Sequence, residues 1–325
     1  MQAEILSHRD IDVNVWDAFV QASPQGMIYS CHHYISALEP EWYAVVVRGA
    51  DMIHAAMPII LRKKGGIMYS TQPIFTQYWG IMFRPAEANT ARSFEQKRQW
   101  VKAIINALPP ELRLFHYNFS PAFDYPLPFF WSGYSISPRY TNQVDLRQTT
   151  EELWANISEK ARGHIRKSEK DGVVVTYGHE VEEVVHIFRK AKDEKIKNMT
   201  PAHYSAITSV AHHYAQKGMC HTMVARDADG LPVAGCIYFT FRGTTIHFLG
   251  TTDPDYKGRG AMALVIWKAL LQAREHSSVF DFEGSMIEPI EQFFLSFGSV
   301  PTPYLSIKKE SLPLPVRLLK RIMGK

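Results

Sequence analysis

The chain has 325 residues, a length typical of two domains or of one large domain. Its net charge of +4, from 36 Lys and Arg against 32 Asp and Glu, is too small for a dedicated DNA-binding protein. With 46% hydrophobic and 21% charged residues, the composition is that of a folded globular protein and excludes disorder as the main state.

The cysteine pattern and the apolar runs predict the compartment. Cys31, Cys220 and Cys236 form no CxxC pair and no even-numbered framework, which indicates reduced thiols. The N-terminal segment contains acids and lacks the apolar stretch of a signal peptide. No apolar run reaches the roughly 18 residues that span a bilayer. We therefore expect a cytoplasmic protein.

Hydrophobic periodicity predicts the elements of the first half. They are, in chain order, a strand at 3–6, helices at 13–21 and 32–38, hairpin strands from residue 46, a helix at 90–108 and a strand at 112–118. A loop rich in proline and aromatic residues follows at 121–134. A single helix at 150–170 is predicted to join the two halves.

The second half is predicted to follow the order β-α-α-β-β-β-α-β-α-β. The strands lie at 173–177, 219–226, 232–242, 244–251, 279–283 and 304–308, and the helices at 181–188, 201–218, 259–275 and 290–297, with a last helix after residue 315. Asp229-Gly230 predicts a tight hairpin turn, because glycine tolerates a positive φ.

The hairpin of the first half is repeated in the second. When the twenty residues from Val46 are aligned without a gap to the twenty from Val224, seven are identical. The alternative is two unrelated hairpins of similar composition. A repeat of this kind favours one folding unit that is used twice.

Three further segments carry a resemblance to a known family: QPIFTQYWGIMF from Gln72, RYTNQVDLRQTT from Arg139, and FDFEGSMIEPIEQFF from Phe280. Together with the repeat they resemble the Fem-type peptidyltransferases and other tandem members of the GCN-five-related N-acetyltransferase (GNAT) fold. The resemblance implies an α/β (α+β) fold of two tandem GNAT-like modules, each a mixed, mostly antiparallel sheet flanked by helices. The predicted domains are residues 1–148, a joining helix at 149–172, and residues 173–325.

The same resemblance implies a bacterial-type enzyme that transfers an acyl or aminoacyl group to an amine of a cell-envelope or sugar/peptide precursor. The groove between the modules is expected to hold the acceptor. The donor is left open between acyl-CoA and aminoacyl-tRNA, so tRNA stays a candidate partner. Two alternatives remain, a coenzyme A-dependent N-acyltransferase of a small amine and a non-catalytic binding module that kept the fold.

A glycine-rich segment precedes the helix predicted at 259–275. The GNAT pattern is Gln/Arg-x-x-Gly-x-Gly/Ala, whose backbone N–H groups cradle the diphosphate of coenzyme A at a helix N-terminus. Here Lys257, Gly258, Arg259 and Gly260 are the candidate cofactor-binding residues, and Asp255 puts an acid where the pattern has a base. The alternative is a simple glycine turn before a core helix.

The candidate catalytic residues are Asp281, Glu283 and Ser285. Strand alternation predicts both acids on one face, opposite Phe280 and Phe282. Partly desolvated carboxylates are suited to act as a general base for an ammonium, and Ser285 is suited to donate to a carbonyl oxygen. The alternative is that one acid caps the helix that follows.

Eight residues are predicted to bind substrate. Arg162 and Arg166, with Lys170, form a basic ridge on the joining helix that is suited to phosphate, unless it is only a solvated face. Gln72, Gln77 and Tyr78 form a polar-aromatic loop that is suited to a sugar or peptide, or is an ordinary turn. Arg139 and Asn142 are expected on a substrate-facing strand, and Lys308 at the end of the last strand.

No metal site is predicted. The pairs His32-His33 and His212-His213 are adjacent residues, which diverge by about 100° on a helix, and no ligand set at zinc spacing completes them. The C-terminal segment LPLPVRLLKRIMGK is basic and amphipathic, so we expect it either to close the domain or to make peripheral contact with the inner face of a membrane.

Overall fold

The computed structural model describes residues 2–49, 52–85, 90–192 and 199–312. The predicted C-terminal helix and two turn residues of the first hairpin repeat lie outside these ranges. The chain forms two compact units, Met1–Arg139 with Pro303–Lys325, and Tyr140–Thr302. Among the described residues, no helix is both long and apolar enough to cross a bilayer.

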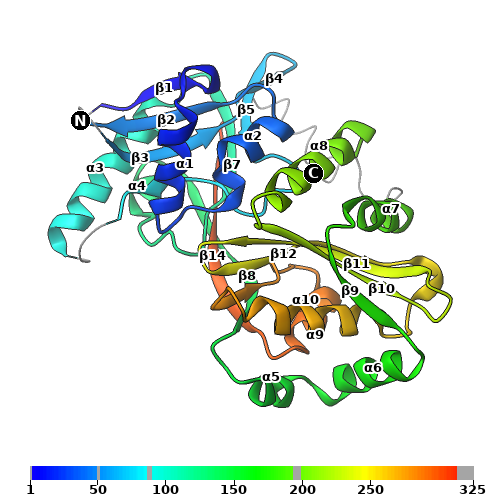
Figure 1. Ribbon diagram of the computed structural model, residues 1–325. Helices are drawn as coiled ribbons and strands as arrows, with labels where there is room; N and C mark the ends of the chain where they lie inside the picture. The colour runs from blue at the N-terminus through cyan, green and yellow to red at the C-terminus, as the bar shows by residue number, and fades with distance from the viewer. Residues whose placement is uncertain (1, 50–51, 86–89, 193–198, 313–325) are drawn as a thin grey trace. The chain divides into compact units, whose positions relative to one another are not determined.

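In its described residues, the first unit contains two groups of paired strands with four α-helices (Figure 1). One group is antiparallel, in the order β1-β2-β3-β6; in the other, β4-β5-β7-β14, strands β5 and β7 run parallel. The strands are β1 (Glu4–Ser7), β2 (Tyr43–Arg48), β3 (Ile53–Ile59), β4 (Arg62–Lys64), β5 (Ile67–Thr71), β6 (Met82–Phe83), β7 (Leu112–Asn118) and β14 (Val300–Glu310). The helices are α1 (Val13–Ala22), α2 (His32–Leu38), α3 (Ala91–Ala107) and α4 (Leu127–Trp131).

The second unit is a sheet in the order β8-β13-β12-β11-β10-β9, antiparallel except between β12 and β13. Its strands are β8 (Ser135–Asp145), β9 (Val174–Gly178), β10 (Cys220–Arg226), β11 (Pro232–Phe241), β12 (Thr244–Thr252) and β13 (Val279–Asp281). Its helices are α5 (Thr150–Asn156), α6 (Glu159–Lys170), α7 (Val181–Lys192), α8 (Pro201–Ala215), α9 (Ala261–Ala273) and α10 (Glu288–Leu295). Figure 1 shows α7 and α8 on one face of this sheet and α9 and α10 on the other.

The core of the second unit lies between its sheet and the helices α5, α6, α9 and α10. Helix α9 is apolar almost all round, with nine of its thirteen residues buried. The Phe282 and Phe294 rings stack at 4.6 Å, and the Trp154 and Trp267 rings meet at 5.0 Å. These contacts hold α10 against the end of β13 and α5 against α9.

The hairpin repeat is present in both units. Pairing of β2 with β3 shifts register between Val47 and Arg48, and pairing of β10 with β11 shifts between Ala225 and Arg226, which are the equivalent positions. The second turn is one residue longer, because Arg48 lies opposite Ile53 while Arg226 lies opposite Pro232. The gap-free alignment therefore holds along the first strand and slips by one residue across the turn.

The predicted joining helix is wrong as a single element. The chain breaks at Ile157, whose backbone is extended, and α6 restarts with Ser158 as its N-cap, where the Ser158 Oγ accepts from the Ala161 N–H at 3.2 Å. Both helices pack inside the second unit. The predicted domain boundaries at 148/149 and 172/173 stay a prediction. The compact units divide the chain elsewhere, at 139/140, and most of β14 belongs to the first unit.

Candidate functional site

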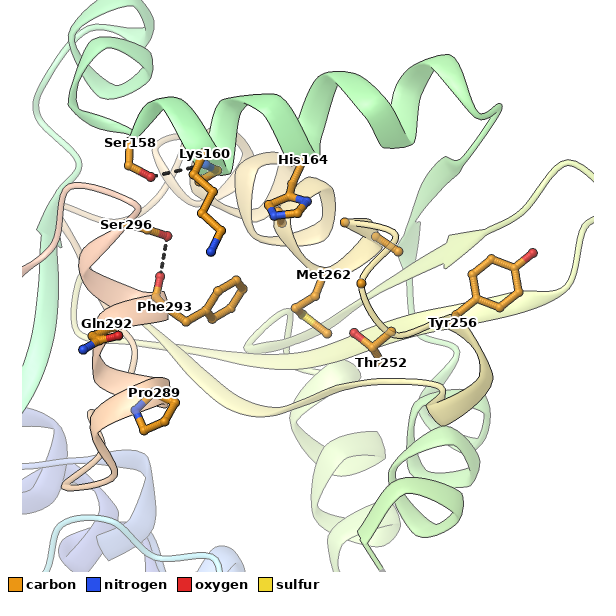
Figure 2. Close-up of a pocket in the computed structure, with 15 residues that line it drawn as sticks. Ser158, Lys160, His164, Thr252, Tyr256, Met262, Pro289, Gln292, Phe293 and Ser296 are labelled. Carbon is orange, nitrogen blue, oxygen red and sulfur yellow. Dashed lines mark hydrogen bonds between the residues drawn. The ribbon is translucent and has the colours of Figure 1, made fainter.

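A pocket of about 570 Å³ lies in the second unit between α6, the glycine-rich segment with the start of α9, and α10 (Figure 2). We call it the helix pocket. Its apolar wall includes Tyr256, Met262 and Phe293, and its charged and titratable groups are Lys160 and His164. None of its described lining residues is acidic. The remaining lining residues are Ser158, Ala161, Thr252, Gly258, Gly260, Ala261, Ala263, Pro289, Gln292 and Ser296.

The N-terminus of α9 forms one wall of the helix pocket. Gly260 is its N-cap, in the left-handed region at φ +86, and no side chain caps the helix. The N–H groups of Ala263 and Leu264 donate to the Gly260 carbonyl at 2.9 and 3.2 Å. The first two N–H groups of the helix, at Ala261 and Met262, have no acceptor within the described ranges, so they are available to an anion.

Gly260 is required here by its surroundings as well as by its φ. A Cβ at this position would lie 2.6 Å from the carbonyl oxygen of His164 and 3.0 Å from the Oγ of Ser168. The glycine thus lets α9 begin directly against α6. At Gly258, φ is +80 but no atom lies within 4 Å of the Cβ position, so only the backbone conformation favours glycine there.

The face of α6 that lines the pocket is not the predicted basic ridge. Lys160 and His164 lie one turn apart on the pocket side, and Figure 2 shows Lys160 reaching between α6 and Phe293. Arg162 donates from Nη1 to the carbonyl oxygens of Trp154, Ala155 and Ile157 at 3.2, 3.1 and 2.7 Å.

Arg162 therefore satisfies the last carbonyls of α5 rather than a ligand. Arg166 lies over the Trp154 ring at 5.6 Å. Both predicted phosphate ligands are accounted for by contacts at the junction of α5 and α6. The signal that could have located this face is the spacing of Lys160 and His164. Residues at i and i+4 lie on the same face of a helix, and both line the pocket together with the N-cap Ser158.

The sheet opens beside the pocket. Strand β12 pairs with β13 only from Thr244 to Ile246, although β12 continues to Thr252. A register shift between Ile237 and Tyr238 in the pairing of β11 with β12 places a bulge next to His247. Bulges of this kind re-aim a side chain and end strand pairing. The last residue of the strand, Thr252, lines the helix pocket.

His247 is a second residue that sequence reasoning missed. Its ring packs among Tyr238, Phe280, Phe282 and Phe294, and burial lowers its pKa to about 4. Its Nδ1 has no hydrogen-bond partner within the described part of the chain. The imidazole is therefore neutral near pH 7.

The two predicted catalytic acids have different environments. Asp281 is buried and accepts from the Thr141 hydroxyl at 2.5 Å, the Gln143 Nε2 at 2.9 Å and the Glu283 N–H at 2.7 Å. A carboxylate held by three donors ties β13 to β8 and to the turn that follows, which is a structural role.

Glu283 lies beyond the end of β13, because the strand stops at Asp281 and the backbone of Glu283 is left-handed at φ +60. The predicted alternation holds for Phe280 and Phe282, which both join the core, but not for Glu283. Burial raises the pKa of Glu283 well above its usual range. Burial thus favours the protonated form of this carboxyl group.

Neither Asp281 nor Glu283 takes the alternative role of capping the helix that follows. Helix α10 begins at Glu288 with Ile287 as its N-cap and no side-chain cap bond, so neither acid caps it. Ser285 Oγ accepts from the Ile287 N–H at 3.1 Å and thereby closes the turn before α10. Its hydroxyl proton remains available to donate.

The charged residues of the glycine-rich segment lie around the turn. Lys257 and Arg259 are exposed, and the Arg259 guanidinium lies 4.5 Å from the centre of the Tyr256 ring. Asp255, at the position where the GNAT pattern has a base, forms an ion pair with Lys190 at 2.7 Å. The pocket therefore takes its cation from α6, through Lys160, rather than from this position.

The polar-aromatic loop of the first unit supports its own fold. Gln72 donates to the carbonyl oxygens of Thr76 and Gln77 and accepts from the Asn118 N–H at 2.7 Å. The Nε2 of Gln77 donates to the Tyr304 hydroxyl at 3.1 Å.

Tyr78 is 1% exposed and meets the Tyr304 ring edge-on at 5.3 Å. These contacts favour the alternative of a packed turn over a sugar-binding surface.

The other predicted ligands do not line the helix pocket. Lys308 forms an ion pair with Glu310 at 2.7 Å. Arg139 is half-buried, and Asn142 is fully buried with no hydrogen-bond partner for either side-chain polar atom among the residues described. No group of three or more His, Cys, Asp or Glu within the described ranges is arranged to hold a metal ion.

Comparison with known proteins identifies the fold. Residues 155–286, which include most of the helix pocket, match the family described as Acetyltransferase (GNAT) domain. No curated protein sequence matches the chain.

The chain is similar over almost its whole length to three solved structures. FemX has 11% identity, covers 99% of this chain and 100% of its own, and has a TM-score of 0.66. L-PGS from Bacillus licheniformis has 13% identity, with 97% and 98% covered and a TM-score of 0.57. A tandem GNAT protein from the clavulanic acid biosynthesis pathway has 13% identity, with 96% and 99% covered and a TM-score of 0.54. The chain therefore contains a GNAT acetyltransferase domain and has the fold of the Fem-type and tandem GNAT proteins.

Proposed function

We propose that the protein is an acyltransferase that binds a phosphate-linked acyl donor in the helix pocket and transfers the acyl group to an amine. The observation that carries this proposal is the combination of free N–H groups at Ala261 and Met262 with the ammonium of Lys160 around one pocket without acidic residues. A helix N-terminus and a lysine together attract a phosphate group.

Acyl-CoA is the donor that fits these features best. Its diphosphate matches the start of α9 and Lys160, while its apolar arm matches the wall formed by Met262 and Phe293. A volume of about 570 Å³ is within the usual range for a small-molecule site, which is roughly 300–1,000 Å³. Aminoacyl-tRNA shares the phosphate-linked acyl group and is the second donor to be tested.

In the proposed reaction the amine nitrogen attacks the acyl carbonyl, the new C–N bond forms, and the C–S bond to coenzyme A breaks. The proton leaving the nitrogen passes to a base. We assign this step to the carboxylate form of Glu283, which stands in the turn after β13 and outside the lining of the helix pocket. Asp281 positions the turn that carries Glu283 through the hydrogen bond to its N–H.

The acceptor we propose is an amine of a cell-envelope precursor, with a small free amine as the alternative. The likeness to FemX over the full length of both chains supports the first choice. Transfer assays with an amine-bearing muropeptide precursor and with small polyamines, each with labelled acyl-CoA, separate the two acceptors.

The donor site is tested by calorimetry with acetyl-CoA on Lys160→Glu and on the matched control Lys170→Glu. Both residues are exposed lysines of α6, but only Lys160 lines the pocket. Loss of a charged contact to phosphate is expected to weaken binding about 10- to 100-fold in Lys160→Glu and to leave the control unchanged. Equal effects in the two variants, or no binding of acetyl-CoA or of aminoacyl-tRNA to the unaltered protein, would contradict the proposal.

A further inference from the structure

Helix α4 of the first unit exposes a row of large apolar side chains. Leu127, Phe130 and Trp131 are 44%, 63% and 53% exposed. They are spaced i, i+3, i+4 and so share one face of the helix, while Pro128 and Phe129 between them are buried. Single exposed apolar residues are common, but three on one face mark an interaction surface.

Cations lie at the C-terminal end of this face. The Nζ of Lys102 lies 5.9 Å from the centre of the Trp131 ring. A hollow of about 360 Å³ begins at Ser132, directly after Trp131, and is lined by Arg113 and Lys309. The Nζ of Lys309 donates to the Ser132 carbonyl at 3.0 Å, which fixes it at the rim.

None of the three cations forms an ion pair with an acid in the described parts of the chain. The acids nearby are already held. Asp124 pairs with Lys97 at 2.7 Å, Glu95 with Arg98 at 2.6 Å, and Glu310 with Lys308 at 2.7 Å. The surface therefore presents apolar side chains next to cations that form no ion pair among the described residues.

We propose that this surface, Leu127, Phe130 and Trp131 with Lys102, Arg113 and Lys309, binds the surface of an anionic lipid bilayer. Tryptophan and phenylalanine enter the boundary between headgroups and acyl chains, and lysine and arginine next to them contact the lipid phosphates. The apolar row supplies the insertion, and the hollow with Arg113 and Lys309 receives a phosphate. This inference does not depend on the proposed function, because its test has no activity readout.

The test is cosedimentation of the full chain with vesicles of phosphatidylcholine alone and with one third phosphatidylglycerol. The unaltered protein is expected to bind the anionic vesicles and to bind the neutral ones at least tenfold more weakly. Phe130→Ser with Trp131→Ser is expected to lower binding to anionic vesicles about tenfold or more, since affinity scales with the buried apolar area. Lys102→Gln and Arg113→Gln are each expected to lower it about fivefold.

Two controls keep these outcomes specific. Leu231→Ser removes a 60% exposed apolar side chain of the second unit, and Lys64→Gln removes an exposed cation of β4. Each is expected to change binding less than twofold. Circular dichroism melting of every variant shows that it is folded.

Undiminished binding by the Phe130/Trp131 variant would overturn the proposal. It would assign membrane affinity to another part of the chain, such as residues 313–325, which carry four Lys or Arg and no acid. Equal binding to neutral and anionic vesicles would also overturn it. So would a dimer in vesicle-free solution that the Phe130/Trp131 variant abolishes, because the surface would then serve a second copy of the chain.

Discussion

The contact between α6 and α9 that shapes the helix pocket is tested by Gly260→Ala with Gly258→Ala as its control. Both glycines have a positive φ, so an alanine in either place costs about 1–2 kcal/mol of unfolding free energy from the left-handed backbone. At Gly260 the new methyl group would also lie 2.6 Å from the His164 carbonyl oxygen, whereas at Gly258 it meets no atom within 4 Å.

Relieving the overlap at Gly260 requires α9 to move away from α6, which costs about 1–3 kcal/mol more. Urea unfolding is therefore expected to show a loss of about 1–2 kcal/mol for Gly258→Ala and of about 2–5 kcal/mol for Gly260→Ala. Acetyl-CoA binding should weaken more in Gly260→Ala, since the shift displaces the first N–H groups of α9. Equal losses of stability in the two variants would refute the packing argument.

Three further results are expected. Arg162→Ala should lower the unfolding free energy by about 1–3 kcal/mol in urea titrations, because three carbonyls at the end of α5 each lose one hydrogen bond. Acetyl-CoA affinity should stay unchanged, and a large loss of affinity would instead place Arg162 in the binding site. For His247, the folded pKa is about 4 and the unfolded pKa about 6.5, so below pH 6.5 the unfolded chain binds a proton that the folded chain does not. The free energy of unfolding should therefore fall by about 1.4 kcal/mol for each pH unit as the pH is lowered from 6.5 to 4. His247→Gln should remove this contribution to the pH dependence, and an unchanged pH dependence would contradict a buried neutral imidazole. Glu283→Gln should reduce turnover at least about 100-fold with little change in stability, and full activity in this variant would remove Glu283 from the mechanism. Asp281→Ala should lower the unfolding free energy by about 2–4 kcal/mol, because one buried and two part-buried donors lose their acceptor.

Much of the fold could be predicted from hydrophobic periodicity and turn residues. The predicted hairpin at 219–226 and 232–242 matches β10 and β11, and helix α9 lies within the predicted 259–275. The tandem GNAT architecture is likewise confirmed. Both hairpins also shift register at equivalent positions, a structural similarity that the residue identities alone do not reveal.

Two local features could not be read from periodicity. The break at Ile157 follows a continuous helical pattern, and only the N-cap bond of Ser158 and the carbonyl contacts of Arg162 show why two helices form. Helix α4 lies where we expected a loop, because prolines at 126 and 128 are usual loop residues but also suit the first turn of a helix.

The candidate site was predicted in part. Gly258 and Gly260, which the glycine spacing singled out, both line the helix pocket, and their role in cofactor binding stays a prediction. Charged residues were placed less well. Helical spacing alone does not show which face of α6 meets the pocket, and the basic ridge predicted from it contains Arg162 but not Lys160. A strand pattern also cannot show where the strand ends, and the positive φ of Glu283 separates it from Asp281.

The central claim is that the start of α9 and Lys160 hold the phosphates of an acyl donor in the helix pocket. A crystal structure of the protein with bound acetyl-CoA tests it most directly. We predict diphosphate oxygens within hydrogen-bond distance of the Ala261 and Met262 N–H groups and of the Lys160 Nζ, with the pantetheine arm against Phe293. Coenzyme A bound elsewhere on the protein, or an empty helix pocket in crystals saturated with the donor, would contradict it.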